Sequence, residues 1–309
     1  MATIAERAQP ALPAGGRRMS LRRRARWVDR AATGVLWGFA SLIVVILAAI
    51  LLYTLQAGLS IIDWRFLTTA DVDGIGIGPE VFNTFYIIGL ALLICVPVAG
   101  GAAIYLAEYA KQGPFITAVR FATETLAGIP SLIIGLFGFL IFVTNFGQGH
   151  RFGFSRLAGA LTLVILNLPL LLRVTEDAIR SVPNELREGS YAVGANKLQT
   201  VLKVLVPTSL PALTTGIILT AGKMLGETAA LIFTAGGSSS INGWFSLDPL
   251  TSGDTLTVHL FVLKSEGLQA NANQLAAGTA AVLIALLLIF NLGLRYLAGR
   301  LTRRLSGRS

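Results

Sequence analysis

The feature that most constrains this chain is a series of apolar stretches, each long enough to cross a lipid bilayer. About 20 consecutive apolar residues form a helix that spans the ~30 Å hydrocarbon core. Stretches with few or no charges predict six such spans, at residues 33–57, 82–106, 122–144, 157–177, 208–235 and 273–296. Each span must be helical, because lipid offers no hydrogen-bond partner to a backbone N–H or C=O group. The sequence therefore predicts an all-α integral membrane protein.

Composition excludes the main alternatives to a membrane protein. Of the 309 residues, 54% are hydrophobic and 13% are charged, whereas soluble domains average about 25% charged residues. A soluble globular enzyme is therefore excluded, as is disorder of all but the chain ends. The single cysteine, Cys95, lies in an apolar run and can form neither an intrachain disulfide nor a cysteine-cluster metal site.

Basic residues predict the orientation of the spans. With a cytoplasmic N-terminus, the cytoplasmic segments hold 20 Lys and Arg residues and the outer loops hold 4, in agreement with the positive-inside rule. We expect a disordered basic cytoplasmic tail at 1–27, a six-span domain at 28–300 and a second basic cytoplasmic tail at 301–309. The net charge of +9 comes largely from the basic tails, which we expect to contact anionic membrane lipid. No nucleic-acid partner is expected.

The segment between the fourth and fifth spans, residues 183–207, is polar but regularly patterned. Its apolar residues recur at helical intervals and Gly194 interrupts them, which predicts two short helices that meet at a bend. Pro207 suits the first turn of the fifth span. Spacing alone leaves two interpretations open: a stiff cytoplasmic handle for a partner protein, or an ordinary interfacial amphipathic helix.

Residues of this segment resemble the EAA loop of bacterial ABC importer permeases. The family pattern is Glu-Ala-Ala, three residues, Gly, nine residues, and Ile-any-Leu-Pro. Glu188, Gly194 and Pro207 fit that spacing, and the other motif positions exchange only small or aliphatic residues. In the family this loop is the coupling helix that docks into a groove of the ATPase subunit. The resemblance therefore implies an ATPase-coupling role for Glu188, Gly189, Ser190, Ala192, Gly194 and Pro207.

Three further stretches resemble the permeases of the phosphate-specific transporter, and among them the PstA family. They are Gly128–Ser131 with Gly135–Gly138, Ala103–Tyr109, and Gly226–Ala229. The resemblance covers roughly Asn83 to Arg295 and excludes the head before Trp27. It implies a type I ABC importer permease with six transmembrane helices in the bacterial plasma (inner) membrane. The implied partners are two copies of an ATP-binding subunit, a second homologous permease (PstC-like) and a periplasmic or lipid-anchored phosphate-binding protein.

Three charges in or near the spans are candidate residues of a substrate pathway. Lys223 and Glu227 lie in the predicted fifth span, where a lone charge at midplane costs about 2.5–3.5 kcal/mol on insertion scales. They either pair and hold helices together, or Lys223 lines an anion path and Glu227 keeps Lys223 from binding the anion too tightly. Permeases of the phosphate family generally carry Arg at the position of Lys223, so the charge is kept but the bidentate fork is lost. Arg173, at the inner end of the fourth span, either faces the path or marks the cytoplasmic interface.

No motif in the chain predicts an enzyme or a cofactor. Gly222-Lys223-Met224 lacks the Gly and the Ser or Thr that a P-loop needs at positions 217 and 224, so the energy must come from another subunit. His150 and His259 are not part of an HExxH pattern, which excludes a zinc protease. The predicted function is a phosphate importer permease without cofactors. The alternatives are the same machine for sulfate or molybdate, or a membrane-embedded enzyme or scaffold.

Overall fold

The computed structural model describes residues 16–69, 76–111, 113–144, 152–237, 245–266 and 271–305. These residues form helices joined by loops, and no strand occurs among them. The predicted all-α class is therefore confirmed. The chain divides into two compact units, Met1–Tyr53 and Thr54–Ser309.

Helix α1 (Gly16–Leu59) makes up the described part of the first unit and continues beyond Tyr53. Its portion from Trp27 is long and apolar enough to cross a membrane. The expectation of disorder over 1–27 is wrong from Gly16 onward, because Arg, Leu and Ala are strong helix formers and extending an existing helix costs little. Residues 1–15 of that predicted tail lie outside the described residues.

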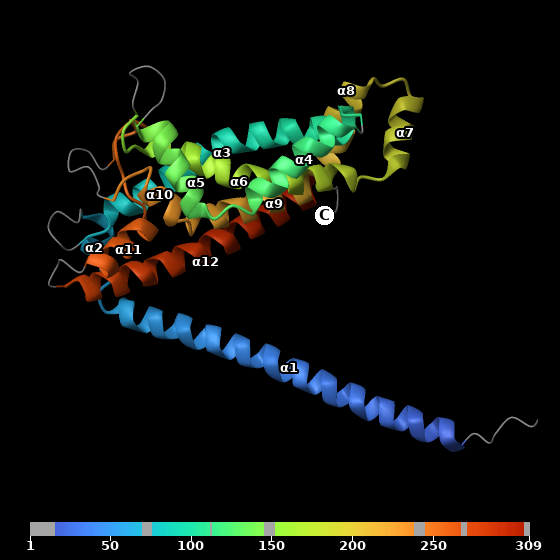
Figure 1. Cartoon of the computed structure of the whole chain (residues 1–309), viewed down its shortest axis with the longest axis horizontal. Helices are drawn as coiled ribbons and strands as arrows, with labels where there is room; N and C mark the ends of the chain where they lie inside the picture. Colours follow the sequence, from blue (N-terminus) through green and yellow to red (C-terminus); the bar gives the residue numbers. More distant parts are fainter. Residues whose placement is uncertain are drawn as a thin grey trace, which may run out of the picture. The chain divides into compact units, whose positions relative to one another are not determined.

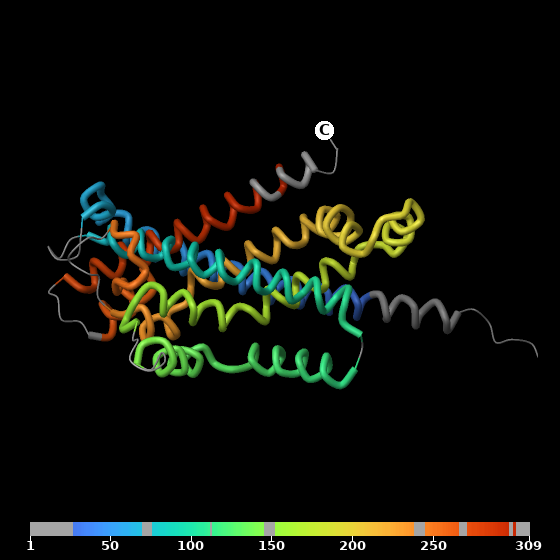
Figure 2. Tube along the Cα trace, turned by 90° about the horizontal axis from the view of Figure 1, so that it is seen from above, coloured from blue at the N-terminus to red at the C-terminus, as the bar shows by residue number. Residues whose placement is uncertain are grey.

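In the second unit, long helices run side by side and short helices occupy their ends (Figure 1, Figure 2). Helices α7 and α8 lie at one end, which we call the α7 end, and α2, α10 and α11 lie at the opposite end. The helices are α2 (Trp64–Thr68), α3 (Gly78–Ile104), α4 (Pro114–Ala127), α5 (Ser131–Gly138), α6 (Arg156–Arg180), α7 (Asn184–Ala192), α8 (Lys197–Thr200), α9 (Val206–Leu225), α10 (Ala229–Ile232), α11 (Leu256–Glu266) and α12 (Ala272–Leu305). Three π-helical turns continue or precede them: η2 (Tyr105–Tyr109), η3 (Phe139–Thr144) and η4 (Val201–Leu205).

The core of the second unit is the contact between α3 and α6. A stripe of small residues at intervals of four on α3, namely Ala91, Cys95, Ala99 and Ala103, is fully buried in the same cluster as residues of α6. Small side chains let two helix backbones approach closely, which is how helices associate in lipid. Cys95 is thus a buried packing residue.

The predicted third span, 122–144, is not one straight helix. Helix α4 ends at Ala127, and α5 with η3 starts again at Ser131 at an angle of 102°. Pro130 has no N–H to donate and disfavours a helical conformation at Ile129, so the helix breaks there. The structure has five helices able to span a membrane among the described residues, and six spans when this bent pair counts as one.

The predicted fifth span, 208–235, is also broken. Helix α9 ends at Leu225, Gly226 caps it, and the short α10 begins only at Ala229. Glycine has one of the lowest helix propensities, which favours a stop at this position. Lys223 therefore lies in the last turn of α9 and Glu227 lies beyond its end, so the two residues are not on one continuous helix, as the predicted span 208–235 had placed them. Helix α12 likewise extends to Leu305, into the predicted tail 301–309, and residues 306–309 lie outside the described residues.

Gly135 allows α5 to pack closely against α10. A Cβ atom at Gly135 would lie 2.8 Å from the Ala230 Cα and 3.0 Å from the Ala229 carbonyl oxygen, and backbone atoms of this kind cannot rotate away. We expect Gly135→Val to push the helices apart and to cost about 1–3 kcal/mol, as overpacking does. Thermal unfolding in detergent measures the loss. Gly101→Val, at a position with open space around the Cβ, is the matched control and should unfold near the wild-type temperature.

Candidate functional site

A cavity of about 410 Å³ lies between α4, α6 and α9 of the second unit. Charged side chains dominate its wall, although the helices around it are apolar. They are Arg120 and Glu124 from α4, Arg173, Glu176, Asp177 and Arg180 from α6, and Lys223 from α9. Charges cluster inside an apolar bundle only where they pair or meet water, so the cavity is the first candidate for a binding site.

The charges of this cavity do not fully cancel. The Glu176 carboxylate accepts from Arg120 at 2.9 Å and from Arg180 at 2.8 Å, and Arg173 lies 3.6 Å from Glu124. Lys223 forms no ion pair with any other described residue. Four basic side chains face three acidic ones, which leaves one net positive charge on the wall. The cavity can therefore attract an anion without a deep cluster of cations to trap it.

The structure brings two of the three predicted pathway residues together. Arg173 and Lys223 both line the cavity. The Arg173–Glu124 pair is 70% and 65% exposed, and such pairs contribute only about 0–1 kcal/mol, so Arg173 is easily released. Glu227 does not line this cavity. It lies in the break after α9, where its Oε1 accepts from the Ala230 N–H at 3.4 Å.

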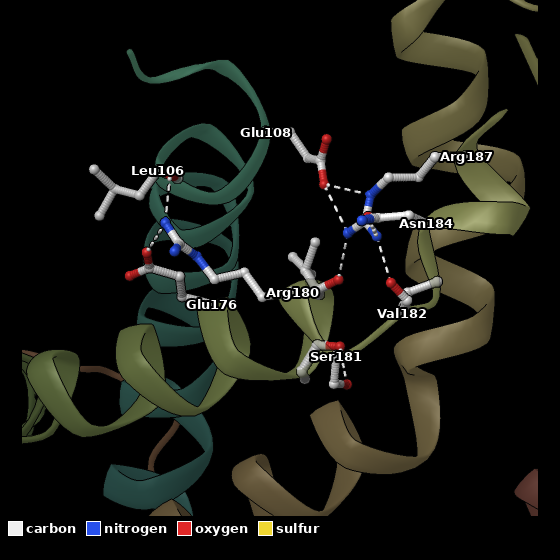
Figure 3. Close-up of polar contacts among 10 residues, drawn as sticks. Leu106, Glu108, Glu176, Arg180, Ser181, Val182, Asn184 and Arg187 are labelled. Carbon is white, nitrogen blue, oxygen red and sulfur yellow. Dashed lines mark hydrogen bonds and ion pairs between the residues drawn. The ribbon is translucent and has the colours of Figure 1, made fainter. Parts of the chain in front are cut away.

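Polar contacts connect the cavity to the α7 end. Glu176 lines the cavity and binds Arg180, whose Nη2 donates to the Leu106 carbonyl in η2 at 3.4 Å. Two residues further along η2, Glu108 accepts from Arg187 of α7 (Figure 3). A π-helical turn of this kind often marks a functional position. Helix α7 and the cavity wall therefore both contact η2, α7 through Arg187 and the wall through Arg180.

Arg187 uses all five of its N–H donors, and four of these hydrogen bonds hold α7 to residues outside it. Nε and Nη2 donate to Glu108 Oε1 at 3.2 and 3.1 Å, and Nη2 also donates to the Ile179 carbonyl at 2.9 Å. Nη1 donates to the Val182 carbonyl and, at 3.1 Å, to Asn184 Oδ1. The guanidinium thus binds the Ile179 carbonyl in the last turn of α6 and the Val182 carbonyl just after it. The side chains of Arg187 and Glu108 are 15% and 9% exposed, so the pair is largely shielded from water.

The predicted helix–bend–helix is present in the loop 183–207. Helix α7 ends at Ala192, Gly194 has a φ of +87° that favours glycine, and α8 begins at Lys197 behind an Asn196–Gln199 capping box. The Ser190 Oγ lies 2.9 Å from the Thr200 Oγ1 and fastens the two helices together. Glu188, Gly189 and Ala192 are exposed, and Pro207 is in the first turn of α9.

Apolar side chains on the same loop are also exposed. Leu186, Tyr191 and Leu198 are between 43% and 57% exposed, and Val193 is 85% exposed. A helix–bend–helix segment at the end of a bundle with exposed apolar side chains is typical of a protein-binding surface.

Several functional candidates escape sequence reasoning. Arg120 and Glu176 are not recognised as partners across 56 residues, nor are Glu108 and Arg187 across 79 residues. The available signal was that Glu108 falls in a motif stretch and Arg187 in the loop next to Glu188. These ion pairs could have been predicted by matching each charged residue at the end of an apolar run with residues of opposite charge on the same predicted side of the membrane.

Comparison with known proteins agrees with this arrangement. The family model described as "Binding-protein-dependent transport system inner membrane component" matches residues 99–307. A Bacillus subtilis protein named probable ABC transporter permease YqgI is 37% identical over 290 residues, which cover 90% of this chain and 97% of that protein. The phosphate transport system permease protein PstA of Mycobacterium leprae is 34% identical over 222 residues, covering 71% of this chain and 69% of PstA.

A solved structure shows the same fold. The bacterial alginate ABC transporter, crystallised with an alginate-bound periplasmic protein, contains a chain that superposes with a TM-score of 0.63. The match covers 92% of this chain and 98% of that chain at 16% identity. At this identity the likeness concerns the fold, which is the type I ABC importer permease architecture predicted above.

Proposed function

The chain belongs to the family of binding-protein-dependent transport system inner membrane components, and from that membership we propose that it lines the membrane path of an importer for inorganic phosphate. It is a multi-pass ABC permease, a transport component rather than an enzyme. The proposed energy source is ATP hydrolysis on a separate subunit, which acts on this chain through α7.

One observation carries the choice of an anionic substrate: Lys223 lines the cavity without a carboxylate partner among the described residues. Inorganic phosphate carries one to two negative charges at neutral pH. A single ammonium group attracts such an ion, and the neighbouring Glu176 and Glu124 weaken its retention so that it can leave. The similarity to PstA supports phosphate among the oxyanions.

The exposed loop supports the coupling role proposed for Glu188, Gly189, Ser190, Ala192, Gly194 and Pro207. Its apolar side chains fit a groove of the ATPase subunit, and burying them there would add the favourable free energy of removing apolar surface from water. The contacts of Arg187 with Glu108 and the end of α6 would then pass a movement of α7 to η2 and the cavity.

The remaining parts of the machine are inferred from the family. Two ATPase subunits would bind one coupling loop each, and a second, PstC-like permease would complete the path. The α7 end would face the cytoplasm with both termini of the chain, and the opposite end would receive phosphate from a periplasmic or lipid-anchored binding protein. Closure of the ATPases would switch the spans between two access states as rigid bodies.

The decisive experiment is uptake by vesicles that hold the reconstituted complex. We expect labelled phosphate to accumulate in an ATP-dependent manner, with unlabelled sulfate and molybdate in tenfold excess leaving most of the rate, as roughly twentyfold or greater discrimination would. Vesicles without ATP are the control. Accumulation of sulfate or molybdate in preference to phosphate would contradict the substrate, and ATP-independent uptake would contradict the mechanism.

A further inference from the structure

Three side chains with metal-ligating atoms meet in the interior of the bundle, away from the cavity. Glu80 comes from the first turn of α3, His259 from the first turn of α11, and Asp254 from the segment just before α11. One ligand atom of each lies within 4.8 Å of the others. The Nδ1 atom of His259 is 3.7 Å from Asp254 Oδ2.

The backbone around this group is held in place. The Leu256 N–H at the start of α11 donates to the Thr84 Oγ1 of α3 at 3.0 Å, and the Thr84 hydroxyl donates to the Glu80 carbonyl at 2.6 Å. The His259 N–H donates to the Thr255 carbonyl at 2.8 Å. The three side chains are thus presented by segments that are already fixed to one another, as a binding site requires.

All three side chains are buried, with Glu80 1%, Asp254 2% and His259 5% exposed. Carboxylate oxygens and an imidazole nitrogen are the ligand atoms that proteins most often offer to divalent transition-metal ions. Metal ions bind the deprotonated carboxylate and the neutral imidazole, so such an ion would use all three side chains as ligands.

A fourth donor lies beside the group. Asn83 follows Glu80 by one turn of α3 and is 1% exposed, and neither its Oδ1 nor its Nδ2 has a hydrogen-bond partner among the described residues. The Asn83 amide lies against Gly253, where a Cβ would come within 2.6 Å of Nδ2 and 2.8 Å of Oδ1. It therefore borders the residue that precedes Asp254. A buried amide without a partner next to two carboxylates and an imidazole offers one more oxygen ligand.

The spacing of the ligand atoms suits a small ion. Three atoms within 4.8 Å of one another leave a point that is roughly 2.8 Å or less from each, while bonds from Zn²⁺ to imidazole nitrogen and carboxylate oxygen measure about 2.0–2.2 Å. Side-chain shifts of less than about 1 Å would close that difference. Imidazole together with carboxylates favours first-row transition metals over Mg²⁺ and Ca²⁺, which take oxygen ligands.

We propose that Glu80, Asp254 and His259, with Asn83 beside them, bind a divalent transition-metal ion of the Zn²⁺ or Mn²⁺ class. The ion would fasten α11 to the start of α3. Since the Thr257 hydroxyl of α11 donates to the Glu227 carbonyl at 2.9 Å, the ion would also steady the break between α9 and α10. The role is structural and involves no bond making or electron transfer.

The test is the metal content of the complex purified in detergent with its partner subunits. The sample is stripped with a chelator, equilibrated with Zn²⁺ or Mn²⁺, freed of excess ion and analysed by mass spectrometry of the elements. We expect about one ion per chain in the wild type and at least tenfold less in His259→Gln and Glu80→Gln, the size of effect that altering a metal site commonly has. Asp248→Asn, which removes an exposed carboxylate outside the group, is the matched control and should keep the ion.

A second measurement needs no variant and so holds even if the substitutions prevent folding. Added Zn²⁺ or Mn²⁺ should raise the unfolding temperature of the stripped wild-type complex, because an ion that binds only the folded state stabilises it. Mg²⁺ at the same concentration should leave that temperature unchanged. A wild-type complex that retains no ion and shows no shift would overturn the proposal, as would equal retention by wild type and His259→Gln. Equal shifts with Mg²⁺ would overturn the assignment to a transition metal.

Discussion

Replacing Arg187 with Gln is expected to lower ATP-driven phosphate uptake at least tenfold while the ATPase subunit stays bound. The substitution leaves Glu108, whose side chain is 9% exposed, without its cation, and breaking such a buried pair costs about 3–5 kcal/mol. It also withdraws the donors from the Ile179 and Val182 carbonyls. Helix α7 then keeps its exposed apolar side chains but loses its tie to η2, so ATPase movement no longer reaches the cavity. Uptake, ATP hydrolysis and co-purification of the ATPase are measured on the same vesicles.

Two further variants sharpen this result. Arg187→Lys should also impair uptake, because an ammonium group has three donors and cannot reproduce the five contacts of the guanidinium. The double variant with Glu108→Gln should be no worse than Arg187→Gln alone, since residues that act as a unit give non-additive effects. Glu185→Gln, an exposed carboxylate in the first turn of α7, is the control. Uptake within twofold of wild type in Arg187→Gln would refute the proposed connection.

The apolar pattern was sufficient to predict where most spans lie. Predicted spans at 157–177 and 273–296 fall inside α6 and α12, because in lipid a long apolar run has no alternative to a helix. The bend at Gly194 was equally predictable, since its φ of +87° is one that a glycine adopts without strain. These features depend on local chemistry alone.

Two breaks were missed because hydropathy does not report them. Gly128, Pro130 and Gly226 are apolar enough to pass as parts of a span, yet their backbone properties end the helices α4 and α9. The break at Gly226 also separates Glu227 from Lys223, so their spacing in the sequence could not show whether the two side chains pair.

Contacts between residues far apart in the sequence account for the rest. The cavity joins Arg120 to Glu176 and places Arg173 near Lys223, and the group around His259 reaches back to Glu80. Each such meeting depends on how the helices pack, and packing is set by small-residue stripes such as Ala91 to Ala103 rather than by the charges themselves. No metal site was predicted, because the three ligands come from distant segments and form no local motif.

Lys223→Gln is expected to lower phosphate uptake at least tenfold without a change in subunit levels. The substitution removes the cavity cation that has no carboxylate partner among the described residues and leaves three acidic against three basic side chains. A neutral wall no longer concentrates an anion, since the attraction of a cleft for its ligand follows its net charge. Because Lys223 is exposed on α9, the change buries no unsatisfied group and assembly should be normal. Uptake is compared with the amount of complex in the same vesicles.

The matched variants separate charge from packing. Lys223→Arg keeps the positive charge and adds the bidentate fork that suits phosphate, so uptake should stay within about threefold of wild type. Lys111→Gln removes another exposed cation that does not line the cavity and should leave uptake unchanged. If Lys223→Gln takes up phosphate normally at full subunit levels, Lys223 is structural and the anion must cross elsewhere. If Lys223→Arg fails together with Lys223→Gln, the shape of the side chain matters more than its charge, and the electrostatic account of the cavity is wrong.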